Sequence, residues 1–197
     1  MFIQAMRENE GKKNYIGGGE ESYGFLCEDF VRDKDAVSAC VILAEIAAWA
    51  KDQGLSLYQL LQKIYVEYGF SKEKGISVVK KGKSGAEEIE AMMKKFRENP
   101  LTEIAGSKVT YFYDYSTLKG KDYAENETVT LDMPTTSNVL QYFTEDNTKV
   151  SIRPSGTEPK IKFYCEVHSK VKSIDELPEA EKAAEEKINQ IKASLGI

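Results

Sequence analysis

The strongest constraint on the fold is a strict alternation of apolar and polar residues near the C-terminus. The apolar positions are Ile161, Phe163, Cys165 and Val167, with Lys162, Tyr164, Glu166 and His168 between and after them. Residues two apart in a strand lie on the same face of a sheet, so this pattern predicts a strand with one face buried and one face exposed. A covered face and an open face are typical of antiparallel sheets packed against helices.

The rest of the second half supplies partners for this strand. We predict short strands at Ile76–Val79, Val139–Phe143 and Lys149–Ile152, with a turn at 145–148. The stretch 109–115 also alternates: Val109, Tyr111, Tyr113 and Tyr115 on one face, Thr110, Phe112 and Asp114 on the other. Residues 116–137 look like an irregular connection.

Two helices complete this half. The first opens at a capping box, Ser84–Glu87, and stops before Pro100, while the second runs from about Pro178 to Leu195. The predicted fold class is therefore α+β, a mostly antiparallel sheet with two helices on one face.

The first part of the chain is predicted to be mostly helical. After a strand near 14–18, a helix from Lys34 to about Gln53 has Asp33 as its expected N-cap. A capping box, Ser56–Gln59, opens a second amphipathic helix, which Gly69 closes. Polar, glycine-bearing residues then follow, so we predict two domains, 1–72 and 73–197.

Composition excludes several classes of protein. The net charge is −5, whereas sequence-independent binding to nucleic acid needs a basic face. The most apolar stretch, Ala36–Ala50, is shorter than the roughly 20 residues of a membrane span, and the N-terminus does not resemble a signal peptide. Three widely spaced cysteines without a CxxC pair argue against a disulfide framework or a zinc site. We therefore expect a cytoplasmic protein with neither nucleic acid nor a membrane as partner.

A glycine-rich segment, 17–24, follows the first predicted strand. It contains four glycines, two carboxylates and a hydroxyl. Glycines allow a ligand to approach the backbone closely, and a carboxylate beside a hydroxyl suits the vicinal hydroxyls of a sugar. From residue types alone, a tight turn with solvated acids explains the segment as well.

A second segment, Arg153–Pro159, lies between two predicted antiparallel strands. Its arginine offers a fork that fits phosphate, its Ser155 and Thr157 offer hydroxyls, and Gly156 frees the backbone for an anion nest. Flanking lysines, Lys162 among them, make the surroundings positive. A hairpin turn that carries an ordinary surface arginine is the alternative.

At these two segments the sequence resembles the α-D-phosphohexomutases, the phosphoglucomutases and phosphomannomutases of bacteria. Residues 19–24 match the family's sugar loop, GE(x)S(x)G, and residues 153–159 match its phosphate loop, R(x)SGTEP. The residues that follow each loop also look like this family, in which the phosphopentomutases form a related branch. The resemblance extends over essentially the whole chain.

The resemblance implies a fold and a set of roles. It implies that 1–72 is the end of a truncated α/β domain 3, and that 73–197 is domain 4, with a fold like the TATA-binding protein. Gly19, Glu20 and Ser22 would meet the sugar hydroxyls. The phosphate that is not transferred would bind to Arg153, Ser155, Gly156, Thr157 and Lys162. The overall reaction interconverts hexose 1-phosphate and hexose 6-phosphate through a bisphosphate, in carbohydrate metabolism.

The departures from the family are equally specific. Neither a serine loop of the TASHNP kind nor a DGDxDR loop occurs in the sequence. The resemblance therefore implies the C-terminal portion of a larger intramolecular phosphotransferase, with no catalytic residue and no metal ligand of its own. Mg²⁺ would bind to an absent domain, glucose 1,6-bisphosphate would act as activator of the full-length enzyme, and the fragment alone would be inactive.

Partners and alternatives follow from the same resemblance. The expected partners are a phosphosugar and the N-terminal domains of the same protein. A homodimer through the truncated domain is also expected, because that domain should expose apolar surface. A phosphopentomutase-type substrate or a non-catalytic phosphosugar-binding module would fit the two motifs as well.

Overall fold

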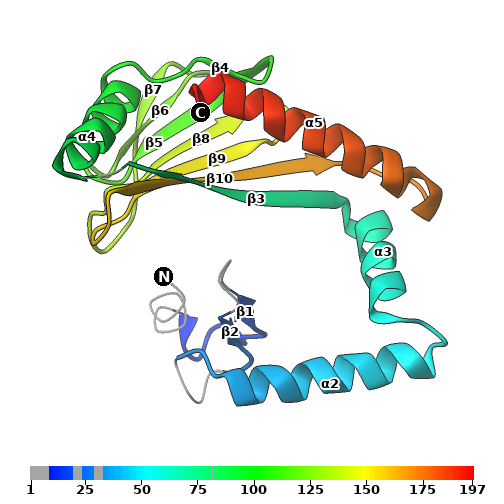
Figure 1. The fold of residues 1–197 in the computed structure, drawn as a ribbon. Helices are drawn as coiled ribbons and strands as arrows, with labels where there is room; N and C mark the ends of the chain where they lie inside the picture. The colour runs from blue at the N-terminus through cyan, green and yellow to red at the C-terminus, as the bar shows by residue number, and fades with distance from the viewer. Residues whose placement is uncertain (1–8, 20–23, 29–32, 81) are drawn as a thin grey trace. The chain divides into compact units, whose positions relative to one another are not determined.

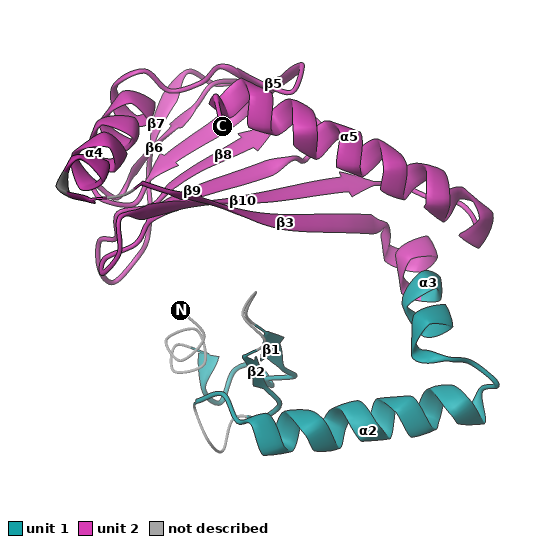
Figure 2. Ribbon diagram, in the orientation of Figure 1, with its two compact units in different colours: residues 1–63 teal, residues 64–197 magenta. Residues whose placement is uncertain are grey.

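A computed structural model of the protein describes residues 9–19, 24–28, 33–80 and 82–197. The chain divides into two compact units, 1–63 and 64–197, which are coloured separately in Figure 2.

The first unit contains a short hairpin and a long helix. Strands β1 (Gly18–Gly19) and β2 (Phe25–Leu26) pair antiparallel, and helix α2 spans Ala36–Asp52. The N-cap of α2 is Asp35 and not the predicted Asp33. The Asp35 carboxylate accepts hydrogen bonds from the backbone N–H groups of Val37 and Ser38, which Asp33 is too far upstream to reach.

The capping box at the next helix is confirmed. Ser56 N–H donates to Gln59 Oε1 at 2.8 Å, and Gln59 N–H donates to Ser56 Oγ at 3.2 Å. These reciprocal bonds satisfy two backbone donors at the start of helix α3, Leu57–Tyr68.

Helix α2 presents apolar side chains to solvent. Among its described residues only Ala50 is buried, while five large side chains are exposed: Val37, Val41, Leu43, Ile46 and Trp49. A helix with apolar residues all round is normally covered on more than one side. This exposure agrees with the apolar surface expected for the first domain. No helix in the described part of the chain has the length and apolarity needed to cross a membrane.

The second unit is built on an eight-stranded sheet in which every pairing is antiparallel. Its order is β3-β10-β9-β8-β5-β6-β7, with β4 paired to β5. The strands are β3 (Phe70–Val79), β4 (Glu103–Ile104), β5 (Ser107–Asp114), β6 (Lys119–Asp122), β7 (Glu127–Thr130), β8 (Leu140–Thr144), β9 (Lys149–Pro154) and β10 (Lys160–Ser169).

Two helices cover one face of this sheet, as predicted. Helix α4 (Gly82–Glu98) begins two residues before the predicted capping serine, and α5 (Leu177–Leu195) follows a short 3-10 turn, Ile174–Glu176. Figure 1 shows both helices on the same side of the strands. The core between helices and sheet is formed by aliphatic and aromatic side chains, including Ile89, Met93, Phe96, Tyr142, Ile152, Phe163, Ile188 and Ile191.

The alternating segment forms β10, and its predicted burial is confirmed. Ile161 and Phe163 are fully buried, and the polar residues between them lie on the face without helices. β3 is longer than the predicted Ile76–Val79, because all ten residues of β10 pair with it, from Lys160 opposite Val79 to Ser169 opposite Phe70.

Two predictions in the middle of this unit are wrong. A β-bulge between Val109 and Tyr111 puts Val109 on the buried face with Phe112 and Asp114, although simple alternation assigns it to the face of Tyr111. Residues 116–137, predicted to be an irregular connection, contain the two strands β6 and β7. These two strands pair at the edge of the sheet, where few side chains are buried and the apolar alternation is absent.

Candidate functional site

The segment Arg153–Pro159 forms the end of β9 and the loop that leads into β10. Ser155 N–H donates to the carbonyl of Lys160 at 2.8 Å, and Lys160 N–H donates to the carbonyl of Glu158 at 2.7 Å. The loop is also held from outside, because Lys80 N–H donates to the carbonyl of Pro159 at 2.9 Å. These backbone hydrogen bonds fix the shape of the loop.

Two hydroxyls and a glycine lie at the tip of this loop. Ser155 Oγ accepts a hydrogen bond of 3.4 Å from Thr157 N–H. Gly156 is exposed and does not adopt the left-handed conformation that the anion-nest hypothesis favours. A Cβ placed on it would meet no other atom within 4 Å. The fold itself therefore does not require glycine here, and the space beside Gly156 is open for a ligand.

Two cations are directly opposed on the uncovered face of the sheet. Arg153 on β9 pairs in register with Lys162 on β10, and strand alternation puts both on the face opposite α4 and α5. Arg153 is exposed, and its guanidinium makes no hydrogen bond or ion pair with any described residue. The Lys162 ammonium lies 5.8 Å from the centre of the Tyr164 ring. Like charges directly opposite one another destabilise a sheet, so this pair favours a bound anion.

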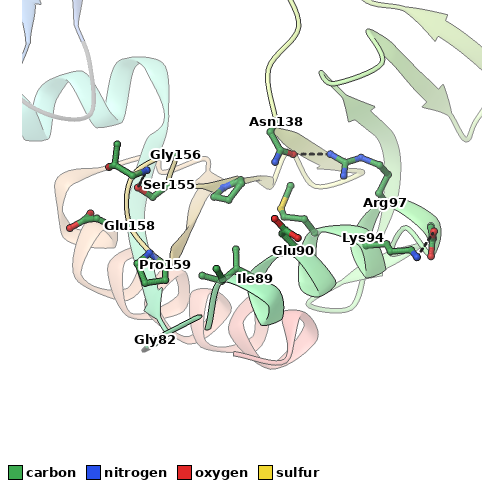
Figure 3. Close-up of a pocket in the computed structure, with 15 residues that line it drawn as sticks. Gly82, Ile89, Glu90, Lys94, Arg97, Asn138, Ser155, Gly156, Glu158 and Pro159 are labelled. Carbon is green, nitrogen blue, oxygen red and sulfur yellow. Dashed lines mark hydrogen bonds and ion pairs between the residues drawn. The ribbon is translucent and has the colours of Figure 1, made fainter. Parts of the chain in front are cut away.

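A cavity of about 800 Å³ lies between this loop and helix α4. Ser155, Gly156 and Thr157 line it on one side, and Ile89 and Met93 give it an apolar wall on the other (Figure 3). Arg153 and Lys162 are not among its lining residues. The predicted phosphate ligands thus surround one loop, with the hydroxyls and glycine on the cavity and the two cations on the open sheet face.

Arg97 and Asn138 line the far side of the cavity, and Arg97 also forms an ion pair with Asp114 behind it, a network that the sequence analysis missed. Arg97 Nε donates to Asp114 Oδ2 at 2.8 Å, and Arg97 Nη2 donates to Asn138 Oδ1 at 2.9 Å, a bond visible in Figure 3. Burial raises the pKa of Asp114, but hydrogen bonds from Arg97 and Ser116 outweigh it and hold that pKa below its ordinary value. These residues are far apart in sequence and belong to no local pattern, so only the fold brings them together.

The predicted sugar loop is described only at its margins. Gly19 ends β1 opposite Phe25, which begins β2. Glu20 and Ser22 lie outside the described residues, so their contact with sugar hydroxyls stays a prediction.

Other reactive groups have ordinary structural roles. Burial raises the pKa of the Cys165 thiol to about 11, which disfavours the nucleophilic thiolate. Cys40 on α2 is exposed, so the apolar side chains of that helix do not cover it. Among the described residues, no group of three or more histidine, cysteine, aspartate or glutamate side chains could hold a metal ion.

Comparison with family models assigns both parts of the chain. Residues 1–68 match "Phosphoglucomutase/phosphomannomutase, alpha/beta/alpha domain III", and residues 76–184 match "Phosphoglucomutase/phosphomannomutase, C-terminal domain". The two matches lie in the same order as the two sequence motifs.

Curated relatives and solved structures agree with these matches. The chain is 37% identical over 167 residues to a phosphoglucomutase of Staphylococcus haemolyticus, and 39% identical over 163 residues to one of Staphylococcus aureus. It covers 85% and 83% of its own length in these alignments, but only 30% and 29% of the relatives. The open form of pp63/parafusin, a phosphoglucomutase from Paramecium, has a TM-score of 0.51 at 18% identity, covering 87% of this chain and 28% of that one. At this low sequence identity, the similarity to the Paramecium structure shows only that the two chains share a fold.

Proposed function

Because the chain belongs to the phosphoglucomutase/phosphomannomutase family, we propose that it is the substrate-binding portion of an enzyme that interconverts hexose 1-phosphate and hexose 6-phosphate through a bisphosphate. The observation that carries this proposal is the pair of opposed cations, Arg153 and Lys162, beside a loop with open space at Gly156. A phosphate monoester carries the charge and the acceptor oxygens that such a site lacks.

Each residue has a distinct part in this proposal. Arg153 binds two phosphate oxygens with its planar fork, and Lys162 contributes a point charge from the neighbouring strand. Ser155 and Thr157 donate hydroxyl hydrogen bonds, while Gly156 lets the phosphate approach the backbone. Gly19, Glu20 and Ser22 bind the sugar hydroxyls. As in the family that the chain resembles, the phosphate held by this loop is the one that is not transferred.

Phosphoryl transfer itself is assigned to other domains of a longer protein. The chain has neither the serine loop nor the DGDxDR loop of the family, and the described residues include no cluster of acidic side chains that fits Mg²⁺. Positioning of the reacting groups supplies a large part of phosphoryl-transfer catalysis. This chain alone therefore binds the substrate and does not turn it over. We place the protein in the cytoplasm, with glucose 1,6-bisphosphate as activator of the full-length enzyme.

Titration calorimetry with wild type and Gly156→Ala tests the proposal. We expect wild type to bind glucose 6-phosphate with a millimolar dissociation constant, about −4 kcal/mol, and to show no binding of glucose. Gly156→Ala should weaken binding about tenfold by occupying the space that the phosphate needs. Its stability should be unchanged or slightly raised, since the new Cβ meets no neighbour.

The same titrations separate the alternatives. Equal affinity for glucose and glucose 6-phosphate would contradict a phosphate site, and so would full binding by Gly156→Ala. Preference for ribose 5-phosphate would move the substrate to the pentose branch. A reading frame upstream of Met1 that encodes a phosphoserine loop and a DGDxDR loop would exclude a stand-alone binding module.

The exposed apolar residues of α2 support a homodimer of this chain when it is alone in solution. Large apolar side chains exposed together on one helix favour association in water. Light scattering should therefore give the mass of a dimer, and replacing Val37 and Val41 with glutamate should shift the mass toward the monomer. A monomer for wild type at all accessible concentrations would contradict this proposal.

A further inference from the structure

A carboxylate lies within the loop that is proposed to bind phosphate. Glu158 forms an ion pair with Lys160, and its backbone carbonyl accepts the Lys160 N–H. The hydrogen bond from Lys160 and the charges of Lys160 and Lys162 lower the pKa of Glu158 below its ordinary value. The carboxylate of Glu158 therefore pairs with Lys160 and also feels the charge of Lys162, one of the two cations proposed to bind phosphate.

The geometry of β10 explains this proximity. Lys160 and Lys162 are two apart on β10, so both point to the uncovered face of the sheet, where Arg153 lies opposite Lys162. Glu158 is one of the residues that line the cavity, and Figure 3 shows its carboxylate on the side of the loop away from helix α4. Three cations and one carboxylate thus share one end of the uncovered face.

We propose that Glu158 sets the affinity of this loop for phosphate by acting as an internal competitor. In the free protein it holds Lys160, and when phosphate reaches Arg153 and Lys162 it opposes the incoming negative charge. Binding then stays weak enough for the substrate to leave the loop and return. This inference rests on the proposed phosphate site and adds a residue that weakens binding.

Titration with inorganic phosphate and with glucose 6-phosphate tests this role in Glu158→Gln. The amide keeps the size of the side chain and the backbone hydrogen bond to Lys160 but removes the charge. We expect both ligands to bind about fivefold more tightly than to wild type, an effect of the size typical of exposed charge pairs. The gain should disappear in 1 M NaCl, where the Debye length is about 3 Å, and a purely structural role would not give this salt dependence.

Glu103→Gln is the matched control. Glu103 is an exposed carboxylate on β4, which pairs with the start of β5, away from the end of the sheet where the loop lies. This variant changes the net charge of the protein by the same amount and should bind phosphate as wild type does. A gain equal to that of Glu158→Gln would assign the effect to net charge and overturn the proposal.

The remaining outcomes are also decisive. Unchanged affinity in Glu158→Gln, with Arg153→Ala weakened, would overturn the competitor role and leave the phosphate site intact. Weaker binding of glucose 6-phosphate but not of inorganic phosphate would make Glu158 a sugar ligand instead. Absence of binding by wild type and by Glu158→Gln would overturn both this inference and the proposed function.

Discussion

Replacing Phe163 with alanine is expected to lower the free energy of unfolding of the second unit by about 3–5 kcal/mol. Phe163 is fully buried on β10, and its ring lies 6.2 Å from that of Phe96 on α4 at an interplanar angle of 75°. It is also the cross-strand neighbour of Ile152 on β9 and of Ile76 on β3. The substitution removes contacts in the layer between sheet and helices and leaves a cavity that this layer fills only in part.

Tyr111→Ala is the matched control for that substitution. Tyr111 is also aromatic and on the same sheet, but it is 37% exposed and its ring contacts Tyr113 at 5.9 Å between centroids. We expect a loss of about 1 kcal/mol or less, the typical contribution of a cross-strand aromatic pair such as Tyr111 and Phe143, which are opposite in register on β5 and β8. Chemical denaturation followed by circular dichroism measures both variants. Equal losses would mean that the helices do not cover the face on which Phe163 lies.

The parts of the fold that the sequence predicts correctly are those in which burial follows a local period. β10 alternates residue by residue because one of its faces contacts the helices, and α5 has its apolar residues on one side for the same reason. The capping box at Ser56 is equally local, since its partners are three residues apart. In each case, residues close together in the sequence are enough to predict the local structure.

The errors occur where the structure depends on distant partners. β6 and β7 lie at the edge of the sheet and have little apolar surface to bury, so no period marks them. Packing against the neighbouring strand constrains these residues instead. A Cβ on Gly120 of β6 would lie 2.4 Å from Cδ1 of Tyr113, so close packing against β5 requires glycine. The bulge at Val109 likewise depends on the pairing with β8, which no window of the sequence contains.

In the candidate site, too, some residues are predictable from the local sequence and others are brought together only by the fold. The residues of the phosphate loop are adjacent in sequence, and their chemistry indicates the ligand before the fold is known. The network of Arg97 on α4, Asp114 on β5 and Asn138 just before β8 joins distant parts of the chain, and only the structure reveals it. Glu158 belongs to the recognised motif, but its effect on Lys160 becomes evident only with the ion pair. An acid between Arg153 and the flanking Lys160 is the signal that could have drawn attention to it.

The second large effect is expected for Arg153→Ala, which should weaken binding of glucose 6-phosphate by about 10- to 100-fold. This range corresponds to the roughly 1.5–3 kcal/mol that a hydrogen bond to a charged group contributes. Arg153 has no ion-pair partner among the described residues, so its removal leaves no buried charge behind and should not destabilise the sheet. Arg153→Lys should recover part of the affinity, because it restores the charge without the planar fork.

The central claim is that the loop after β9 binds the phosphate of a phosphosugar through Arg153. The most direct measurement is a titration of isotope-labelled protein with glucose 6-phosphate, followed by NMR at the backbone amides. We predict saturable shifts at Gly156 and Thr157 in wild type and in the variant Lys108→Ala, which removes an exposed cation on β5 far from the loop. At the same ligand concentrations, Arg153→Ala should give shifts that do not approach saturation. Shifts at Gly156 that persist unchanged in Arg153→Ala, or shifts confined to other parts of the chain, would contradict the claim.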